Sequence, residues 1–314
     1  MRPYKRLRPT WSNLSCVSLE IEHFGILGGC QQKHLLRPKI KTIFSTFDGT
    51  CILPPAMTTA NDIICHMEAL YNEEQRQVLM RFFKTGPGEY GEGDEFLGLK
   101  VPQTRAIVML CKDFPLREVP QLLMSRWHEV RLCGLLLMVS QFERLSLKRL
   151  EYDDKAIGKR DAILTMYLRY ADRANNWDLV DLSAPKLLGA WLLLPTRLGD
   201  GTDDYKRQVM DQLAQDNNLW RQRISMVSTL APMQQRDPSW CLRYAEMLLH
   251  HPHDLMHKAV GWMLREMGKR VSTDLLRDFL SRHAHHMPRT TLRYAIERMS
   301  PQERQRWMNR KTSL

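Results

Sequence analysis

The feature that most constrains this chain is a helical periodicity that begins near residue 59 and continues almost to the C-terminus. Apolar residues recur at i, i+3, i+4 and i+7 in segments of roughly 10–17 residues, which short polar or proline-containing breaks divide. The sequence shows no convincing pair of strands. The pattern predicts an all-α protein, with a kink at Pro185 and a frayed basic end at 301–310. The predicted helices are 59–70, 73–84, 102–112, 116–124, 127–143, 156–171, 177–194, 203–215, 218–231, 238–250, 255–269, 272–284 and 288–299.

Residues that favour helix starts support several of the breaks. Asn72 stands where a cap is expected, and Pro102 stands where a first helical turn tolerates proline. Asn218 and the pair Asp237-Pro238 open two later segments in the same way.

Helices of this length joined by short turns favour antiparallel neighbours. A long succession of such pairs indicates an α-solenoid of the HEAT or armadillo type rather than a four-helix bundle. No strict repeat period can be read off the sequence, so this is an argument from topology. A solenoid curves, and its concave face suits a rod-like partner such as a duplex or a peptide.

The N-terminal segment differs from the rest of the chain. Residues 1–56 mix proline, glycine, basic and β-branched residues without helical periodicity. We expect a poorly ordered basic extension there, followed by one helical domain over 57–314. The extension is either a basic tail or translated sequence upstream of a true start at Met57 or Met67.

The net charge of +11 and the pI near 9.4 favour a polyanionic partner, either nucleic acid or an anionic membrane surface. Eight of the 46 basic residues and three of the 35 acidic residues lie in 1–56, which leaves 38 bases against 32 acids in 57–314. Any nucleic-acid site in that domain must therefore come from clustering on one face.

Several classes of protein are excluded by composition. The seven cysteines are scattered without a CxxC pair, so neither a disulfide framework nor a zinc site is indicated, and a reducing cytoplasm fits best. The apolar run 187–194 is far shorter than the ~18 residues of a membrane span. A secretion signal is rejected because acidic residues interrupt the apolar stretch before Cys30.

Two candidate ligand motifs carry little weight. The segment 86–91 satisfies GxGxxG, but it follows a helix rather than a strand and is surrounded by acids, so it is interpreted as a connection between helices. His253 and His257 have HxxxH spacing, yet Asp254 stands where a metalloprotease needs Glu. We interpret His253 as part of a helix start, and we expect no metal and no cofactor.

The segment Asn175–Leu182 is more informative. An Asn cap makes Trp177 the first helical residue, so Trp177 and Asp181 share a face at i and i+4, while Asp178 suits the helix dipole. Asp181 lies among apolar residues, where an unpaired carboxylate is costly. Either Asp181 is a functional carboxylate or it pairs with an arginine of the next repeat. The functional interpretation requires that it is not locked against an arginine without an opening.

Two later helices combine tryptophan with arginine. One contains Trp220 with Arg223, and the other contains Trp262 with Arg265 at i and i+3. Gly261 leaves room for a close approach in the middle of the second helix. The alternative is that Trp262 is core packing and Arg265 belongs to a solvated face.

These residues resemble the DNA alkylation repair family of HEAT-like-repeat DNA glycosylases, the AlkD-like enzymes. Four blocks match in order and spacing across about 60–300 of the chain, an extent typical of a repeat array. The blocks are 95–102 (EFLGLKVP) with Arg105, 176–181 (NWDLVD), 219–223 (LWRQR) and 258–266 (KAVGWMLRE).

The resemblance implies a right-handed solenoid that clasps duplex DNA in a concave basic cleft and removes N3- or N7-alkylated purines. It implies that Asp181 is the catalytic carboxylate, that Trp177 and Trp262 flank the deoxyribose of the lesion, and that Arg223 contacts a phosphate. Arg265 matches a contact to the DNA backbone. Phe82 falls where the family often has an aromatic residue.

The implied function is a monofunctional glycosylase of base excision repair that works without base flipping, lyase activity, metal or cofactor. Asp181 would stabilise the oxocarbenium ion or orient the attacking water. The implied partner is double-stranded DNA that contains alkylated purines, and a cytoplasmic monomer, associated with the nucleoid when bound to DNA, is expected. The alternatives are a non-catalytic HEAT-repeat scaffold that binds damaged or branched DNA, and a protein-binding HEAT scaffold.

Overall fold

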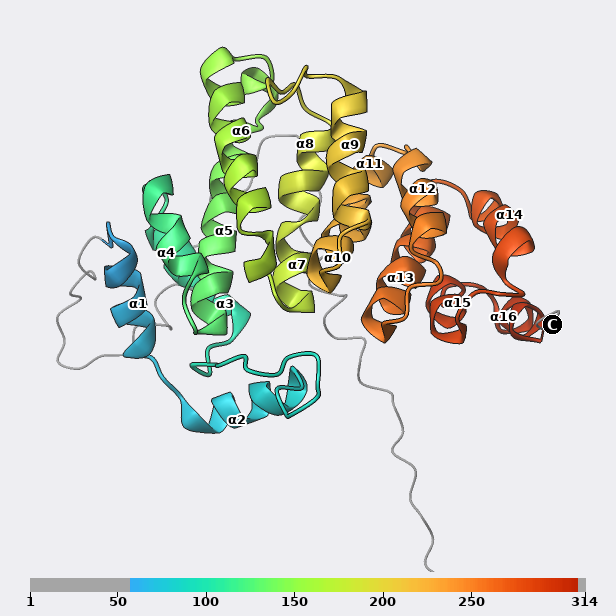
Figure 1. Ribbon diagram of the computed structural model, residues 1–314, viewed down its shortest axis with the longest axis horizontal. Helices are drawn as coiled ribbons and strands as arrows, with labels where there is room; N and C mark the ends of the chain where they lie inside the picture. Colours follow the sequence, from blue (N-terminus) through green and yellow to red (C-terminus); the bar gives the residue numbers. More distant parts are fainter. Residues whose placement is uncertain (1–56, 310–314) are drawn as a thin grey trace, which may run out of the picture. The chain divides into compact units, whose positions relative to one another are not determined.

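The computed structural model describes residues 57–309 (Figure 1). The described residues belong to one compact unit, Pro55–Leu314. The predicted N-terminal extension at 1–56 lies outside them.

Helices make up all the regular secondary structure of residues 57–309, where no strand occurs, so the prediction of an all-α protein is confirmed. The α-helices are α1 (Ala60–Glu68), α2 (Glu73–Phe82), α3 (Val101–Leu110), α4 (Val119–Leu123), α5 (His128–Leu145), α6 (Asp154–Arg169), α7 (Trp177–Ser183), α8 (Ala190–Leu192), α9 (Asp203–Ala214), α10 (Leu219–Ser228), α11 (Leu230–Gln234), α12 (Ser239–Met247), α13 (Asp254–Arg270), α14 (Thr273–His283), α15 (Arg289–Ala295) and α16 (Pro301–Met308). The short turns between them are η1 (Leu116–Glu118), η2 (Lys148–Leu150), η3 (Ala171–Arg173) and the π-turn η4 (Pro185–Gly189).

The predicted helix starts agree with the structure. Asn72 caps α2, because its side-chain oxygen accepts a hydrogen bond of 2.8 Å from the backbone N–H of Gln75. Asn218 caps α10 in the same way, and Pro102 lies in the first turn of α3.

Two predicted helices and the predicted frayed end differ from the structure. The predicted helix 177–194 is interrupted at Pro185, where a kink was predicted, and it divides into α7, η4 and α8. Within η4 the N–H of Gly189 bonds five residues back to the carbonyl of Ala184. The predicted helix 218–231 divides into α10 and α11 near Pro232, which has no N–H to continue the ladder. The end predicted to fray is instead α16, which Ser300 caps.

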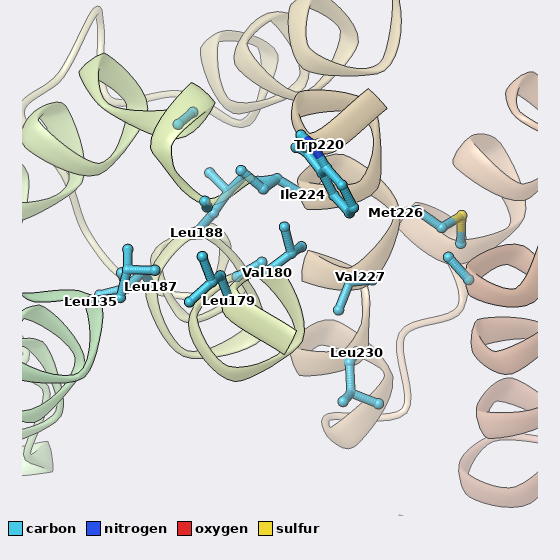
Figure 2. Packing of buried hydrophobic residues seen from close by; sticks show 14 of the residues in the cluster. Leu135, Leu179, Val180, Leu187, Leu188, Trp220, Ile224, Met226, Val227 and Leu230 are labelled. Atoms are coloured by element: carbon cyan, nitrogen blue, oxygen red, sulfur yellow. The ribbon is translucent and has the colours of Figure 1, made fainter. Parts of the chain in front are cut away.

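Helices that are neighbours in sequence pack against one another, as α4 and α5, α9 and α10, and α13 and α14 do, which is consistent with an α-solenoid of helix pairs. Helices two or three elements apart in the chain also pack together. Along the middle of the described unit, α5 packs against α7, α7 against α10 and α10 against α13 (Figure 1). A continuous apolar core runs between them. In Figure 2, Leu179 and Val180 of α7 lie near Ile224 and Val227 of α10, and all four side chains are fully buried. This packing fixes the position of α7 relative to α10.

The close approach predicted at Gly261 is confirmed. A Cβ atom on Gly261 of α13 would lie 2.5 Å from the Cβ of Tyr294 and 2.6 Å from the carbonyl oxygen of Thr291, both on α15. Only glycine fits at this crossing without displacing one of the helices.

Candidate active site

The start of α7 places the two residues singled out on this helix. Asn176 caps it, accepting a hydrogen bond of 2.8 Å from the N–H of Trp177. The Nδ2 group of Asn176 donates to the buried carboxylate of Asp94 at 3.3 Å, which ties this end of the helix to the protein interior. Trp177 is half-buried, and Asp181 follows one turn later on the same face.

Asp181 is paired with Arg223 of α10. The Nε of Arg223 donates to Oδ1 of Asp181 at 3.0 Å and Nη2 donates to Oδ2 at 2.8 Å, a bidentate arrangement. Nη1 donates to the carbonyl oxygen of Leu255 at 2.6 Å, so Arg223 joins α7, α10 and the first turn of α13. The structure therefore contains the ion pair that the structural interpretation expects, and a functional carboxylate can have the same partner. The Asp181 side chain keeps 14% exposure, so the pair is not sealed from solvent.

The charge state of Asp181 is set by opposing effects. Burial raises its pKa above the ordinary value, the Arg223 guanidinium lowers it, and the negative charge of Asp178 raises it further. The net direction is upward. Arg223 is thus the group that favours the carboxylate form.

Aromatic rings from α2 and the residue after it cover Trp177. Phe83 stacks on the indole with ring centroids 5.4 Å apart, and Phe82 meets it edge-on at 5.9 Å. Phe82 is 46% exposed, whereas Phe83 is buried. The structure thus places Phe82 beside Trp177, and Phe83, which sequence reasoning missed, stacks on the same indole.

A buried charge network lies behind the rings. His128 of α5 contacts Asp94 through Nδ1 at 2.7 Å and Asp178 through Nε2 at 2.9 Å, and Arg131 pairs with the other oxygen of Asp94. Asp178 was expected to act only on the helix dipole, so that interpretation was incomplete. The missed signal was the group His128, Glu129 and Arg131 at the start of a helix, directly before the apolar run 132–139.

Tyr90 is a further residue that sequence reasoning missed. The glycine-rich segment connects α2 and α3 as predicted, and it turns back so that the N–H of Gly91 donates to the carbonyl oxygen of Lys84 at 3.1 Å. Tyr90 is half-buried and packs against the core. The pKa of its phenol is raised, because burial and the negative charge of Asp178 outweigh the lowering effect of a hydrogen bond with the Trp177 side chain. Tyr90 therefore belongs to the surroundings of Trp177.

Trp262 and Arg265 lie on α13. Trp262 is half-buried and packs against the core. Arg265 pairs with Glu297 and lies 3.7 Å from Glu266, and its side chain is only 10% exposed. It does not form the solvated face that was the alternative. Its partner Glu297 is more open to solvent, with a side chain that is 56% exposed.

The histidines at the start of α13 have structural partners. His253 caps the helix, its Nδ1 accepting from the N–H of Leu255 at 3.1 Å, as the interpretation of a helix start predicted. His251 contacts Oε1 of Gln222 at 2.7 Å. Across residues 57–309, no three His, Cys, Asp or Glu side chains are grouped so that they could hold a metal ion. A search of the same residues finds no helix with the length and apolar content of a membrane span.

The family model of the DNA alkylation repair enzymes matches residues 63–299. The chain belongs to this family. Membership indicates a role in DNA repair and is consistent with an enzyme that binds DNA. A solved structure from Enterococcus faecalis, described as a predicted DNA alkylation repair enzyme, is similar with a TM-score of 0.53 and 14% sequence identity, covering 74% of this chain and 97% of that one. At this identity the likeness shows the fold alone. No curated protein matches the sequence.

Proposed function

We propose that this member of the DNA alkylation repair family is a monofunctional DNA glycosylase that removes positively charged N3- or N7-alkylated purines from duplex DNA. The single observation that carries the proposal is the Asp181 carboxylate, which is largely buried, still 14% exposed, and one helical turn from a half-buried tryptophan.

The chemistry of the substrate explains why these residue types suffice. An N3- or N7-alkylated purine already carries a positive charge, so its glycosidic bond is weak and the departing base needs no proton. As the bond breaks, positive charge develops on the sugar as an oxocarbenium ion. A carboxylate at Asp181 stabilises that charge and orients the attacking water, and fixed charges in such sites are worth about 3–4 kcal/mol. The indole faces of Trp177 and Trp262 favour a cation beside them.

The pairing of Arg223 is compatible with its proposed contact to a phosphate. A guanidinium has five N–H donors, of which Arg223 uses three in the bonds to Asp181 and Leu255. The two remaining N–H groups can bind a phosphate oxygen of the DNA backbone if DNA binding opens access to this side chain, which is 5% exposed in the free protein. A phosphate bound there would weaken the ion pair between Arg223 and Asp181. The Asp181 carboxylate would then be less neutralised and would stabilise the sugar cation more strongly.

Base release tests the proposal. Purified protein is incubated with duplex DNA that contains 7-methylguanine, and the freed base is measured. Asp181→Asn keeps the size of the side chain and removes its charge, so we expect base release to slow by about 100- to 1000-fold. Asp211→Asn is a matched control, because Asp211 also accepts two bonds from one arginine, Arg243, on α9 and α12. An unchanged rate for Asp181→Asn would refute the catalytic role.

One observation favours a second candidate, a scaffold that binds DNA without cutting it. Both carboxylate oxygens of Asp181 are engaged by Arg223, as a purely structural ion pair would be. This candidate predicts DNA binding that weakens steeply with salt, together with no base release by the unaltered protein.

A further inference from the structure

The buried histidine of α5 is held by a carboxylate at each ring nitrogen. Nδ1 of His128 lies 2.7 Å from Oδ2 of Asp94, and Nε2 lies 2.9 Å from Oδ2 of Asp178. The His128 side chain is 2% exposed. Carboxylate oxygens only accept hydrogen bonds, whereas neutral imidazole has a single N–H. Two such contacts at once require the doubly protonated, positively charged ring.

The two carboxylates differ in their other partners. Asp94 also binds Arg131 and accepts a hydrogen bond of 3.3 Å from the Nδ2 group of Asn176. Asp178 has only His128: within residues 57–309, its Oδ1 is buried and has no hydrogen-bond partner. The charge on His128 is therefore what compensates Asp178, and losing it would leave a buried, unpaired carboxylate in the first turn of α7.

The ring of His128 also reaches Trp177 through aromatic contacts. It stacks on Phe96 with centroids 4.4 Å apart and packs on Phe83 at 5.0 Å, and Phe83 in turn stacks on Trp177. Trp177 is thus connected to His128 twice. One connection runs through the adjacent Asp178, and the other runs through Phe83.

We propose that His128, held as an imidazolium ion between Asp94 and Asp178, is a positioning residue that fixes the first turn of α7 and the Trp177 indole. The proposal rests on the proposed function only for its effect on base release. Its physical core, a charged buried histidine that sets the position of Trp177, is tested without any substrate.

The first measurement is the charge state of His128. In protein with ¹⁵N-labelled histidine, the ring nitrogens of His128 are identified by their absence in His128→Gln. Both nitrogens should remain protonated from pH 6 to 8, since the two carboxylates raise the pKa of the ring to about 9 against the opposing effect of burial. A ring that loses its proton near the ordinary value of about 6.5 would overturn the proposal.

The second measurement is the position of Trp177. Protein labelled with 5-fluorotryptophan gives a ¹⁹F resonance for Trp177, assigned by its loss in Trp177→Phe. His128→Gln should shift this resonance. The control is His283→Gln on α14, because His283 also packs on an aromatic ring, Phe279 at 4.4 Å, and lies 3.4 Å from one carboxylate, Glu246, although its side chain is 19% exposed. If Trp177 responds no more to His128→Gln than to His283→Gln, the proposal is wrong.

A second variant keeps the test decisive if His128→Gln does not fold. Asp178→Asn removes the charge that needs compensation and keeps the side-chain size. It should move the Trp177 resonance and lower the pKa of His128, because one of the two stabilising carboxylates is gone. A His128 pKa unaffected by Asp178→Asn would contradict the proposed coupling.

Base release separates this proposal from the proposed function. With 7-methylguanine duplex in single-turnover conditions, His128→Gln should slow release about tenfold or more, while the affinity for DNA stays unchanged, because Arg223 is not altered. Equal rates for His128→Gln and the unaltered protein would overturn the positioning role. If the unaltered protein releases no base, only the glycosylase proposal fails, and the two resonance measurements still decide the role of His128.

Discussion

Replacing Arg223 with methionine removes a guanidinium that is 5% exposed and keeps most of the stem that packs around it. The Asp181 carboxylate then remains in place without the two N–H groups that donate to it. The carbonyl oxygen of Leu255 also loses the N–H group that donates to it. Breaking one side of a buried ion pair costs about 3–5 kcal/mol. Because Asp181 is 14% exposed and can recruit some water, we expect the lower end, about 3 kcal/mol.

The double variant makes the prediction specific. Asp181→Asn removes the charge that Arg223→Met leaves uncompensated, so the double variant should be more stable than Arg223→Met alone by about 2 kcal/mol. A purely additive loss of contacts would instead make it less stable. The matched control is Arg243→Met, since the Arg243–Asp211 pair is bidentate but its side chains are 48% and 26% exposed, and such pairs contribute about 0–1 kcal/mol.

Urea unfolding at pH 7 measures these differences. With a slope of about 3 kcal/mol per molar, Arg223→Met should lower the midpoint by about 1 M, and Arg243→Met by a few tenths. If the two arginine variants lose equal stability, or if Asp181→Asn fails to rescue Arg223→Met, the ion pair is not the buried, coupled unit described here. Its stabilising role would then have to be given up.

Three further outcomes are expected. The pKa of His128 is raised to about 9, against about 6.5 in the unfolded chain, so the stabilisation by the charged ring is complete below pH 6.5 and is lost as the pH rises towards 9. The free energy of unfolding should therefore fall by on the order of 3 kcal/mol between these pH values. This fall should be absent in His128→Gln. Gly261→Ala should lower the melting temperature because its Cβ would overlap Tyr294, whereas Gly158→Ala, whose Cβ meets nothing within 4 Å in α6, should raise it. Tyr90→Phe removes the hydroxyl that hydrogen-bonds with the Trp177 side chain, so the ¹⁹F resonance of a fluorinated Trp177 should move. The free energy of unfolding should change by less than about 1 kcal/mol. An unmoved resonance would place Tyr90 outside the site.

Local patterns made much of the fold predictable. Caps such as Asn72 and Asn218 act on backbone groups two or three residues away, so the sequence contains all that is needed to place them. The same holds for Trp177 and Asp181, whose shared face follows from a spacing of four. The boundary errors have backbone causes that are also local but subtle, such as the π-turn after Pro185, which periodicity alone does not reveal.

The partners of the site residues could not be predicted in this way, because pairing depends on the packing of distant helices. Arg223 is 42 residues from Asp181, and its role as an ion-pair partner follows from how α7 and α10 share a core. His128 lies 50 residues before Asp178 and 34 after Asp94, so no spacing rule connects the three. Their common signal is physical. Charged residues in apolar helices must find compensation, so each such residue predicts a partner without identifying it. Asp181, His128 and Arg131 all meet that condition in the sequence, and each has an ionic partner in the structure.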